Sequence, residues 1–195
     1  MEDIRTRPLS SIEISAWRTW LPQLLVFIFL LTALAAYLVV PFLAFNWIST
    51  PFIGGFIESP MVINTMGPTG DPGAWSAYNQ GLSKGLALLA IDGQTVRSSA
   101  EISAILRQHQ VGDRVNLEVQ MADGERLTYE VPLTTFPVND QLSYFLIPYL
   151  IGLVYLGCAV WVFALRRFHN SGRSFALFSS GVALAIGLIF DLYTT

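Results

Sequence analysis

The sequence predicts a membrane protein in which three transmembrane α-helices accompany an extracytoplasmic α+β domain. Three observations predict this class. The 195-residue chain is 53% hydrophobic and only 13% charged, which is too apolar for an ordinary soluble domain. Its apolar residues gather in three runs that contain no charged residue. A long polar stretch with turn, helix and strand patterns lies between the first run and the second.

The first two charge-free runs are long enough to cross a bilayer as a helix, which takes about 20 apolar residues, and the third, which Asp191 ends, is near the lower limit. The first run is also too long for a cleavable signal peptide, whose apolar core has about 7–15 residues. We therefore expect transmembrane helices at residues 21–47, 142–165 and 174–193.

Basic residues indicate how these helices are oriented. The tail of residues 1–20 contains Arg5, Arg7 and Arg18, and the short loop 166–173 (RRFHNSGR) contains three more arginines. The segment 48–140, in contrast, carries five basic residues against ten acidic ones. Because cytoplasmic loops are enriched in Lys and Arg, the tail and the short loop are predicted to be cytoplasmic and segment 48–140 extracytoplasmic.

The extracytoplasmic segment has the pattern of a small soluble α+β unit. Asp92-Gly93 and Asp123-Gly124 are turn signals, and each interrupts an apolar run. Ser98 and Glu101 have the spacing of a capping box, in which the two side chains satisfy free amides at a helix start. Alternating apolar residues predict a hairpin after this helix. The strands we expect cover residues 61–65, 86–91, 94–96, 115–119 and 127–131.

The segment from Gly81 to Val96, GLSKGLALLAIDGQTV, resembles the central segment of a bacterial PDZ domain. The following helix and the hairpin VGDRVNLEVQMADGERLTYEVPL resemble the end of that domain, and the likeness extends over about residues 54–133. The resemblance implies a small β-sandwich with capping helices. Leu86 stands where the family usually has an aspartate, which removes a polar loop contact.

What the resemblance implies about function is peptide binding. Its carboxylate-binding loop falls on Gly54, Gly55, Phe56 and Ile57, whose backbone amides would hold a peptide terminus while the peptide adds to the sheet as a strand. On the helix that lines the groove, Ser99 or Ala100 stands where some families have a histidine, and Ile102 also belongs to the implied peptide site. The alternative is a domain of this type that is used only for packing.

The sequence offers no apparatus for catalysis, and we expect a protein that is not an enzyme and has no cofactor and no metal site. The His-Glu-x-x-His zinc pattern is absent. His109 and His169 fall on opposite sides of the membrane in the predicted topology and cannot share a metal. Cys158 is the only cysteine, which excludes disulfides within the chain. The basic residues form no large patch, so no nucleic-acid partner is expected.

Two features of the membrane part point to partners. Ser179, Ala183 and Gly187 lie four residues apart and form a stripe of small residues, which lets helices approach closely. The stripe would pack either within the protein's own bundle or against a partner subunit or second copy. The basic loop would either contact anionic membrane lipid or serve only to set the orientation of the helices in the membrane.

The layout of one span, an external PDZ-like domain and further spans resembles the N-terminal input region of multi-pass bacterial sensor proteins, including sensor histidine kinases. This resemblance implies a multi-pass protein of the bacterial plasma (inner) membrane, whose external domain binds exported or membrane protein segments and serves signal transduction. Two alternatives remain: a non-catalytic accessory subunit of a membrane complex, and an adaptor that presents substrates to a membrane protease.

Overall fold

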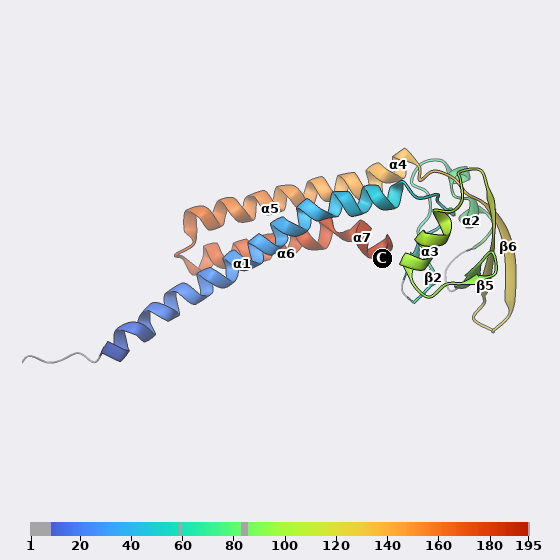
Figure 1. The fold of residues 1–195 in the computed structure, drawn as a ribbon. Coiled ribbons are helices and arrows are strands. Elements are labelled where there is room, and N and C mark those ends of the chain that lie inside the picture. The colour runs from blue at the N-terminus through green and yellow to red at the C-terminus, as the bar shows by residue number, and fades with distance from the viewer. Residues whose placement is uncertain (1–8, 59, 83–85, 195) are drawn as a thin grey trace, which may run out of the picture. The chain divides into compact units, whose positions relative to one another are not determined.

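The computed structural model describes residues 9–58, 60–82 and 86–194. They form two compact units (Figure 1). The first contains the chain up to Leu38 together with Ile151–Ile186. The second contains Val39–Leu150 and the chain from Gly187 onward. The small sheet lies wholly within the second unit.

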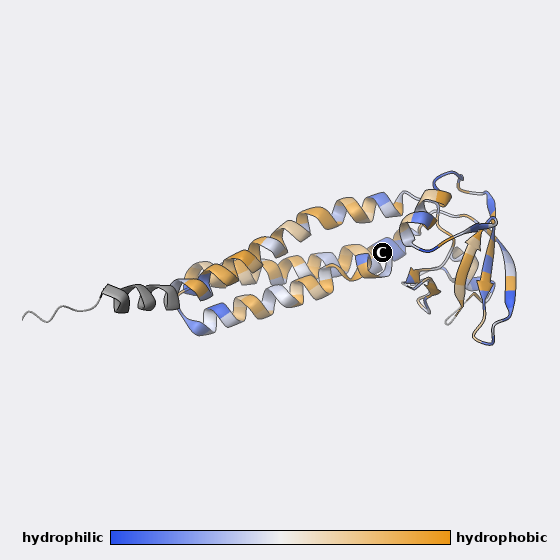
Figure 2. Cartoon of the chain, turned by 60° about the horizontal axis from the view of Figure 1, so that its bottom comes forward, coloured by the Kyte–Doolittle hydropathy of each residue, from blue (hydrophilic) through white to orange (hydrophobic). Residues whose placement is uncertain are grey.

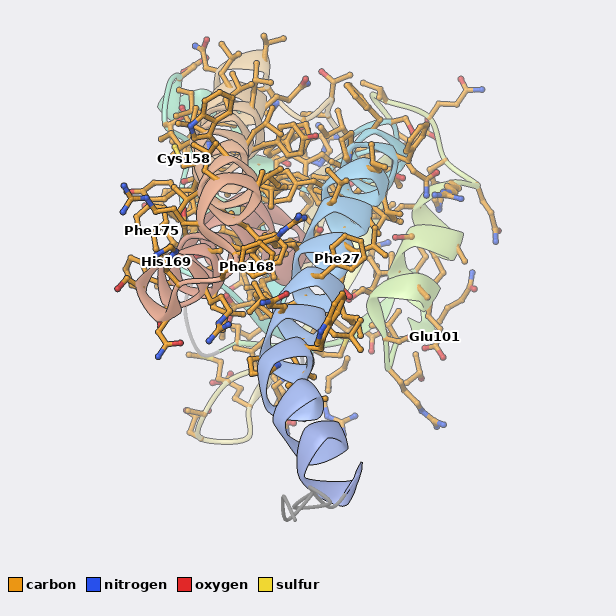
Figure 3. All side chains as sticks on the ribbon, turned by 90° about the vertical axis from the view of Figure 1, so that its left-hand side faces the viewer. Phe27, Glu101, Cys158, Phe168, His169 and Phe175 are labelled. Carbon is orange, nitrogen blue, oxygen red and sulfur yellow. The ribbon has the colours of Figure 1, made fainter. Side chains whose placement is uncertain are left out.

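Three helical stretches are long and apolar enough to cross a membrane, as the charge-free runs predicted. Figure 2 shows that hydrophobic residues dominate along them. On these helices, the side chains of Phe27 and Phe175 point outward and are 53% and 45% exposed (Figure 3). Outward apolar side chains suit a lipid environment rather than water. The candidate spans are Trp20–Ile48, Val138–Arg166 and Asn170–Thr194.

The helix ends differ from the predicted ones. Helix α1 (Leu9–Ile48) begins inside the predicted tail, since no helix-breaking residue separates Leu9 from Trp20. Helices α5 (Ile147–Arg166) and α6 (Asn170–Gly187) shorten the predicted eight-residue loop to Arg167–His169. The second span starts with a helical turn, α4 (Val138–Asp140), and a π-helix (Gln141–Leu146). The third ends in a separate short helix, α7 (Ile189–Thr194), after a break at Leu188.

In the first unit, the small residues of α6 lie inside the helix packing. Ser179 and Ala183 are 1% and 0% exposed. The Ser179 hydroxyl donates to the carbonyl of Tyr155 at 2.8 Å, and the Tyr37 hydroxyl donates to the carbonyl of Ala183 at 2.6 Å. Gly187, the first residue of the C-terminal part of the second unit, is also buried. The stripe therefore packs within this chain.

In the second unit, six described strands form one antiparallel sheet in the order β1-β2-β3-β5-β6, with β4 paired to β3. We expected a β-sandwich, whereas the strands form one connected sheet because β3 pairs with β2, β4 and β5. A register shift between Leu88 and Ala90 interrupts the β3–β5 ladder. The strands are β1 (Ile57–Glu58), β2 (Val62–Ile63), β3 (Ala87–Ile91), β4 (Gln94–Thr95), β5 (Arg114–Gln120) and β6 (Arg126–Pro132).

Helix α3 (Ser99–Leu106) begins as its sequence predicts. The Ser98 hydroxyl accepts the amide of Glu101 at 3.3 Å, and the Glu101 carboxylate accepts the amide of Arg97 at 2.7 Å. The buried face of α3 joins the apolar side of the sheet to form the core. A 3-10 turn (Pro72–Ala74) and helix α2 (Ser76–Asn79) precede β3 in the chain.

Candidate functional site

A cleft lies between the edge strand β1 and helix α3. Its apolar lining includes Ile57 on β1 and Ile102 and Leu106 on α3, all less than 9% exposed. Gly55, Ser99 and Ser103 lie along its rim or wall. None of the described residues that line it is charged. An apolar cleft beside a strand edge is suited to an extended peptide with apolar side chains.

The backbone of β1 is oriented for strand addition at this cleft. Ile57 pairs with Ile63, and the amide of Asn64 donates to the carbonyl of Phe56 at 2.9 Å. Because successive residues of a strand direct their amide and carbonyl groups to opposite sides, those of Ile57 face away from β2. β1 is the last strand on its side of the sheet. The main-chain groups of Ile57 are therefore not paired with β2.

The structure brings four of the six residues assigned by resemblance to the peptide site into the cleft: Gly55, Ile57, Ser99 and Ile102. Gly54 lies elsewhere. Its φ is +83°, and its carbonyl accepts the amide of Tyr78 in α2 at 3.0 Å. Gly54 thus shapes the bend before β1.

Phe56 also lies outside the cleft. Its side chain is 1% exposed and packs in an aromatic cluster, with ring centroids 5.7 Å from Trp47 and 5.2 Å from Trp75. Phe56 directly precedes β1, and successive side chains of an extended backbone point to opposite faces, so the side chains of Phe56 and Ile57 face opposite ways. The resemblance gave these residues one role, whereas the structure divides them between the cleft and the cluster.

The aromatic cluster connects the sheet with the ends of the membrane helices. Besides Phe56 and Trp75, it includes Trp47 near the end of α1 and Phe190 on α7, whose rings are 5.4 Å apart at 89°. Such edge-to-face pairs contribute roughly 0.5–1.5 kcal/mol beyond the area they bury. Tyr144 and Tyr193 pack against this cluster. Its other aromatic members are Phe52, Phe136, Phe145 and Tyr149.

Helix α7 closes one side of the cleft. Tyr193 and Thr194 line it, and the Tyr193 ring is 6.2 Å from that of Phe56. The space that water can enter is about 40 Å³. That is room for only a few water molecules, since each needs on the order of 10–15 Å³. A bulky side chain of a ligand would therefore require Tyr193 or α7 to move.

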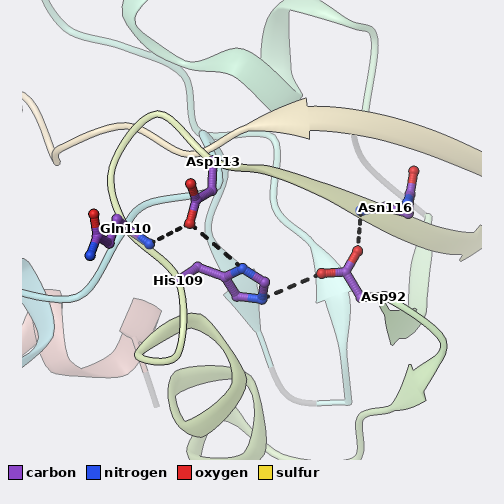
Figure 4. Close-up of polar contacts among 5 residues, drawn as sticks. All are labelled: Asp92, His109, Gln110, Asp113 and Asn116. Atoms are coloured by element: carbon purple, nitrogen blue, oxygen red, sulfur yellow. Dashed lines mark hydrogen bonds and ion pairs between the residues drawn. The ribbon is translucent and has the colours of Figure 1, made fainter.

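Helix α3, the other wall, is held at its C-terminal end. Nε2 of His109 is 3.4 Å from the Asp92 carboxylate, and Nδ1 is 3.9 Å from that of Asp113 (Figure 4). The same two carboxylates accept the amides of Asn116 and Gln110. His109 thus joins the Asp92-Gly93 turn to the turn before β5, which fixes the end of the helix.

A second contact links α3 to the first membrane helix. Nη2 of Arg107 donates to Oδ1 of Asn46 at 2.9 Å. Asn46 lies on α1 next to Trp47, and both residues belong to the second unit. The wall of the cleft is therefore connected to the end of a candidate transmembrane span.

Sequence reasoning missed the part that the membrane helices take in this site. Trp47, Thr50, Tyr193 and Thr194 line the cleft, although they lie at the ends of predicted spans. The available signal was the concentration of aromatic residues at those ends. Within the described residues, no group of three or more His, Cys, Asp or Glu side chains is placed to hold a metal.

Comparisons with known proteins add little to this geometry. No family model and no curated protein matches the chain. The chain is similar to part of the crystal structure of an aminopeptidase N family protein from Idiomarina loihiensis, with 26% sequence identity and a TM-score of 0.36. The match covers 46% of this chain and 14% of that chain. A superposition this loose carries no argument about fold or activity.

Proposed function

We propose that this protein is a membrane-anchored, PDZ-like binding module that captures an extended segment of an exported or membrane protein. The observation that carries the proposal is the cleft between β1 and α3, where the unpaired edge of Ile57 faces an apolar helix wall. Main-chain pairing with β1 would supply affinity, and the apolar pocket would select the ligand side chain. The module is a receptor and carries out no reaction.

The ligand class follows from the lining. Ile57, Ile102 and Leu106 offer only apolar surface, so the ligand side chain that enters is aliphatic or aromatic. The hydroxyls of Ser99 and Ser103 border the same cleft and suit a backbone carbonyl or a terminal carboxylate. Because no charged residue is among the described lining residues, a charged ligand side chain would lose its hydration without a partner.

Helix α7 provides a route from ligand binding to the membrane part. Tyr193 lines the cleft, and Phe190 on the same helix is 1% exposed within the aromatic cluster. The break at Leu188 separates α7 from α6, with which it is continuous in the chain. A ligand that displaces Tyr193 would change how α7 packs and thereby act on the third span. This supports sensory input, as in a signalling protein, as the role of the module.

The competing role as an accessory subunit would use the PDZ-like domain and the small-residue stripe to pack on neighbouring subunits. Ser179 and Ala183 are already buried against this chain's own helices and hydrogen bonded there, so the stripe requires no partner subunit. A substrate-presenting adaptor would use the same cleft as the sensor. Recovery of a fixed stoichiometric complex in mild detergent would favour the subunit role.

The proposal is tested with the full chain in lipid nanodiscs, because the aromatic cluster needs the membrane helices. Fluorescent peptides with apolar C-terminal residues are titrated against the protein and against two variants. Ser103→Trp fills the cleft, whereas Ala104→Trp puts the same side chain on the exposed face of α3. We expect saturable binding that Ser103→Trp abolishes and Ala104→Trp retains.

A matched set of ligands tests the mode of binding. N-methylation of the peptide amide that pairs with Ile57 removes one main-chain donor without changing the side chains. Binding should weaken when that amide is methylated and remain when its neighbour, which faces outward, is methylated. No saturable binding of any peptide, or equal binding by both tryptophan variants, would remove the peptide-receptor function.

A further inference from the structure

A groove lies at the end of the first unit where the apolar part of α1 begins and α5 ends. Its volume is about 410 Å³, and it is separate from the peptide cleft, which belongs to the second unit. Trp20, Gln23 and Phe27 form its α1 side, and Phe163 and Arg167 its other side. Figure 3 shows Phe27 and Phe168 near one another at this end of the unit, and both residues line the groove.

The groove changes from polar to apolar along the helix axes. Trp20 and Arg167 lie at the ends of two candidate spans, Trp20–Ile48 and Val138–Arg166. Phe27 is seven residues further along α1, and Phe163 is four residues before Arg167. At 1.5 Å per residue, these rings lie about 10 Å and about 6 Å deeper than the polar end. This gradient matches a molecule with a polar head and an apolar tail.

The polar end has a net positive charge. Arg167 is the only charged residue among the described ones that line the groove. Its guanidinium carbon is 5.1 Å from the centroid of the Phe168 ring, a cation–π arrangement. No ion pair to Arg167 is formed within the described part of the chain. The planar guanidinium is therefore available to a phosphate, which it binds through two parallel N–H groups.

We propose that this groove binds one anionic phospholipid, with the phosphate at Arg167 and an acyl chain along Leu24, Phe27 and Phe163. The apolar part of the groove selects a lipid over soluble phosphate, which would leave that surface uncovered. Arg167, the one cation among the described lining residues, selects an anionic headgroup over a zwitterionic one. The site is independent of the peptide cleft, so either can fail without the other.

Adjacent arginines provide the matched test. Arg166 and Arg167 are both exposed, but only Arg167 lines the groove. The full chain, stripped of lipid in detergent, is titrated with phosphatidylglycerol and with phosphatidylcholine, and the bound lipids are counted by native mass spectrometry. We expect one saturable phosphatidylglycerol site that Arg167→Gln weakens about fivefold, the usual effect of one basic group near an anionic surface. Arg166→Gln should leave it unchanged.

The acyl part of the site has its own control. Phe163→Trp narrows the groove and should lower lipid occupancy, whereas Leu165→Trp, at a position that is 67% exposed and outside the groove, should not. Equal losses in the two arginine variants would mean diffuse attraction to the basic loop and would overturn the proposal. So would equal binding of phosphatidylcholine, or displacement of the lipid by millimolar inorganic phosphate.

Discussion

The indole nitrogen of Trp75 donates a hydrogen bond to Oδ2 of Asp140 at 2.7 Å, and the two residues are 0% and 1% exposed. Oδ1 of the same carboxylate accepts the amide and the hydroxyl of Thr69. Asp140 lies in α4 at the start of the second candidate span, and Tyr144 donates to the carbonyl of Gly67 nearby. The loop that leads into α2 is thus bonded to the base of a membrane helix.

The hydrogen bond between Trp75 and Asp140 predicts that removing the carboxylate strongly lowers the free energy of unfolding. Asp140→Ala leaves the buried indole N–H of Trp75 without an acceptor, which costs about 2–3 kcal/mol for a bond to a charged group. Glu130→Ala is the control, because it removes only the exposed 3.2 Å pair with Arg114, and such surface pairs contribute about 0–1 kcal/mol. Unfolding by denaturing detergent measures both, and similar midpoints for the two variants would contradict the buried link.

A second prediction separates two glycines that share a left-handed backbone. Gly54 and Gly124 have φ of +83° and +91°. A Cβ at Gly54 would overlap the backbone nitrogen of Ser76 and lie 2.7 Å from that of Ala77, whereas a Cβ at Gly124 meets nothing within 4 Å. Gly124→Ala should therefore cost about 1–2 kcal/mol, the conformational term alone. Gly54→Ala should prevent folding of the domain.

Expression level and thermal unfolding in detergent distinguish these two variants. If Gly54→Ala unfolded at the same temperature as Gly124→Ala, the packing of the Gly54 bend against α2 would be wrong.

The closed side of the cleft leads to a third prediction. Tyr193→Ala removes the ring that narrows the cleft, so less of the protein must rearrange before a peptide enters. If only a fraction of the protein molecules has an open cleft, the apparent affinity for the peptide is reduced by that fraction. Tyr193→Ala should therefore raise the affinity for the peptide by about three- to tenfold. Leu192→Ala is the control, since Leu192 lies on the same helix, is 70% exposed and does not line the cleft. Peptide titration in nanodiscs measures this, and unchanged or weaker binding in Tyr193→Ala would exclude α7 as a lid.

The features that the sequence predicted well depend on neighbouring residues. Charge-free runs identified the three apolar helices because a span needs only a continuous stretch of apolar side chains. Ser98 and Glu101 marked the start of α3 because their bonds close within one helical turn. Asp92-Gly93 predicted the turn between β3 and β4, because a tight turn also depends on adjacent residues. Both residues have positive φ.

The features that the sequence did not predict depend on residues far apart in the chain. The Trp75–Asp140 bond joins residues 65 positions apart, and the Tyr37–Ala183 bond joins residues 146 apart. No local pattern contains that information. Phe56 is different, because the alternation of side chains along an extended backbone was enough to separate its side chain from that of Ile57. The resemblance assigned residues 54–57 to a single binding loop, and this assignment did not take the alternation of side chains into account.

The predicted orientation can be tested with single cysteines. In a Cys158→Ala background, Asp123→Cys lies in the exposed turn between β5 and β6, and Asn170→Cys lies at the basic end of α6. An impermeant maleimide applied to bacterial spheroplasts should label Asp123→Cys directly and Asn170→Cys only after permeabilisation, as the distribution of arginines predicts. The reverse labelling pattern would place the domain in the cytoplasm and end the proposed capture of exported segments.

The packing of the third candidate span gives the last prediction, again from a matched pair. Ala183 is 0% exposed and its carbonyl accepts the Tyr37 hydroxyl, whereas Ala185, two residues on, is exposed. Ala183→Leu forces added volume into a filled space, which costs about 1–3 kcal/mol, and it pushes the Tyr37 bond apart. Ala185→Leu adds the same volume toward lipid and should be neutral. Unfolding in denaturing detergent compares them. If the two variants were equally stable, or if Ala185→Leu alone broke apart an oligomer on native gels, the small-residue stripe would face a partner instead of this chain's own helices.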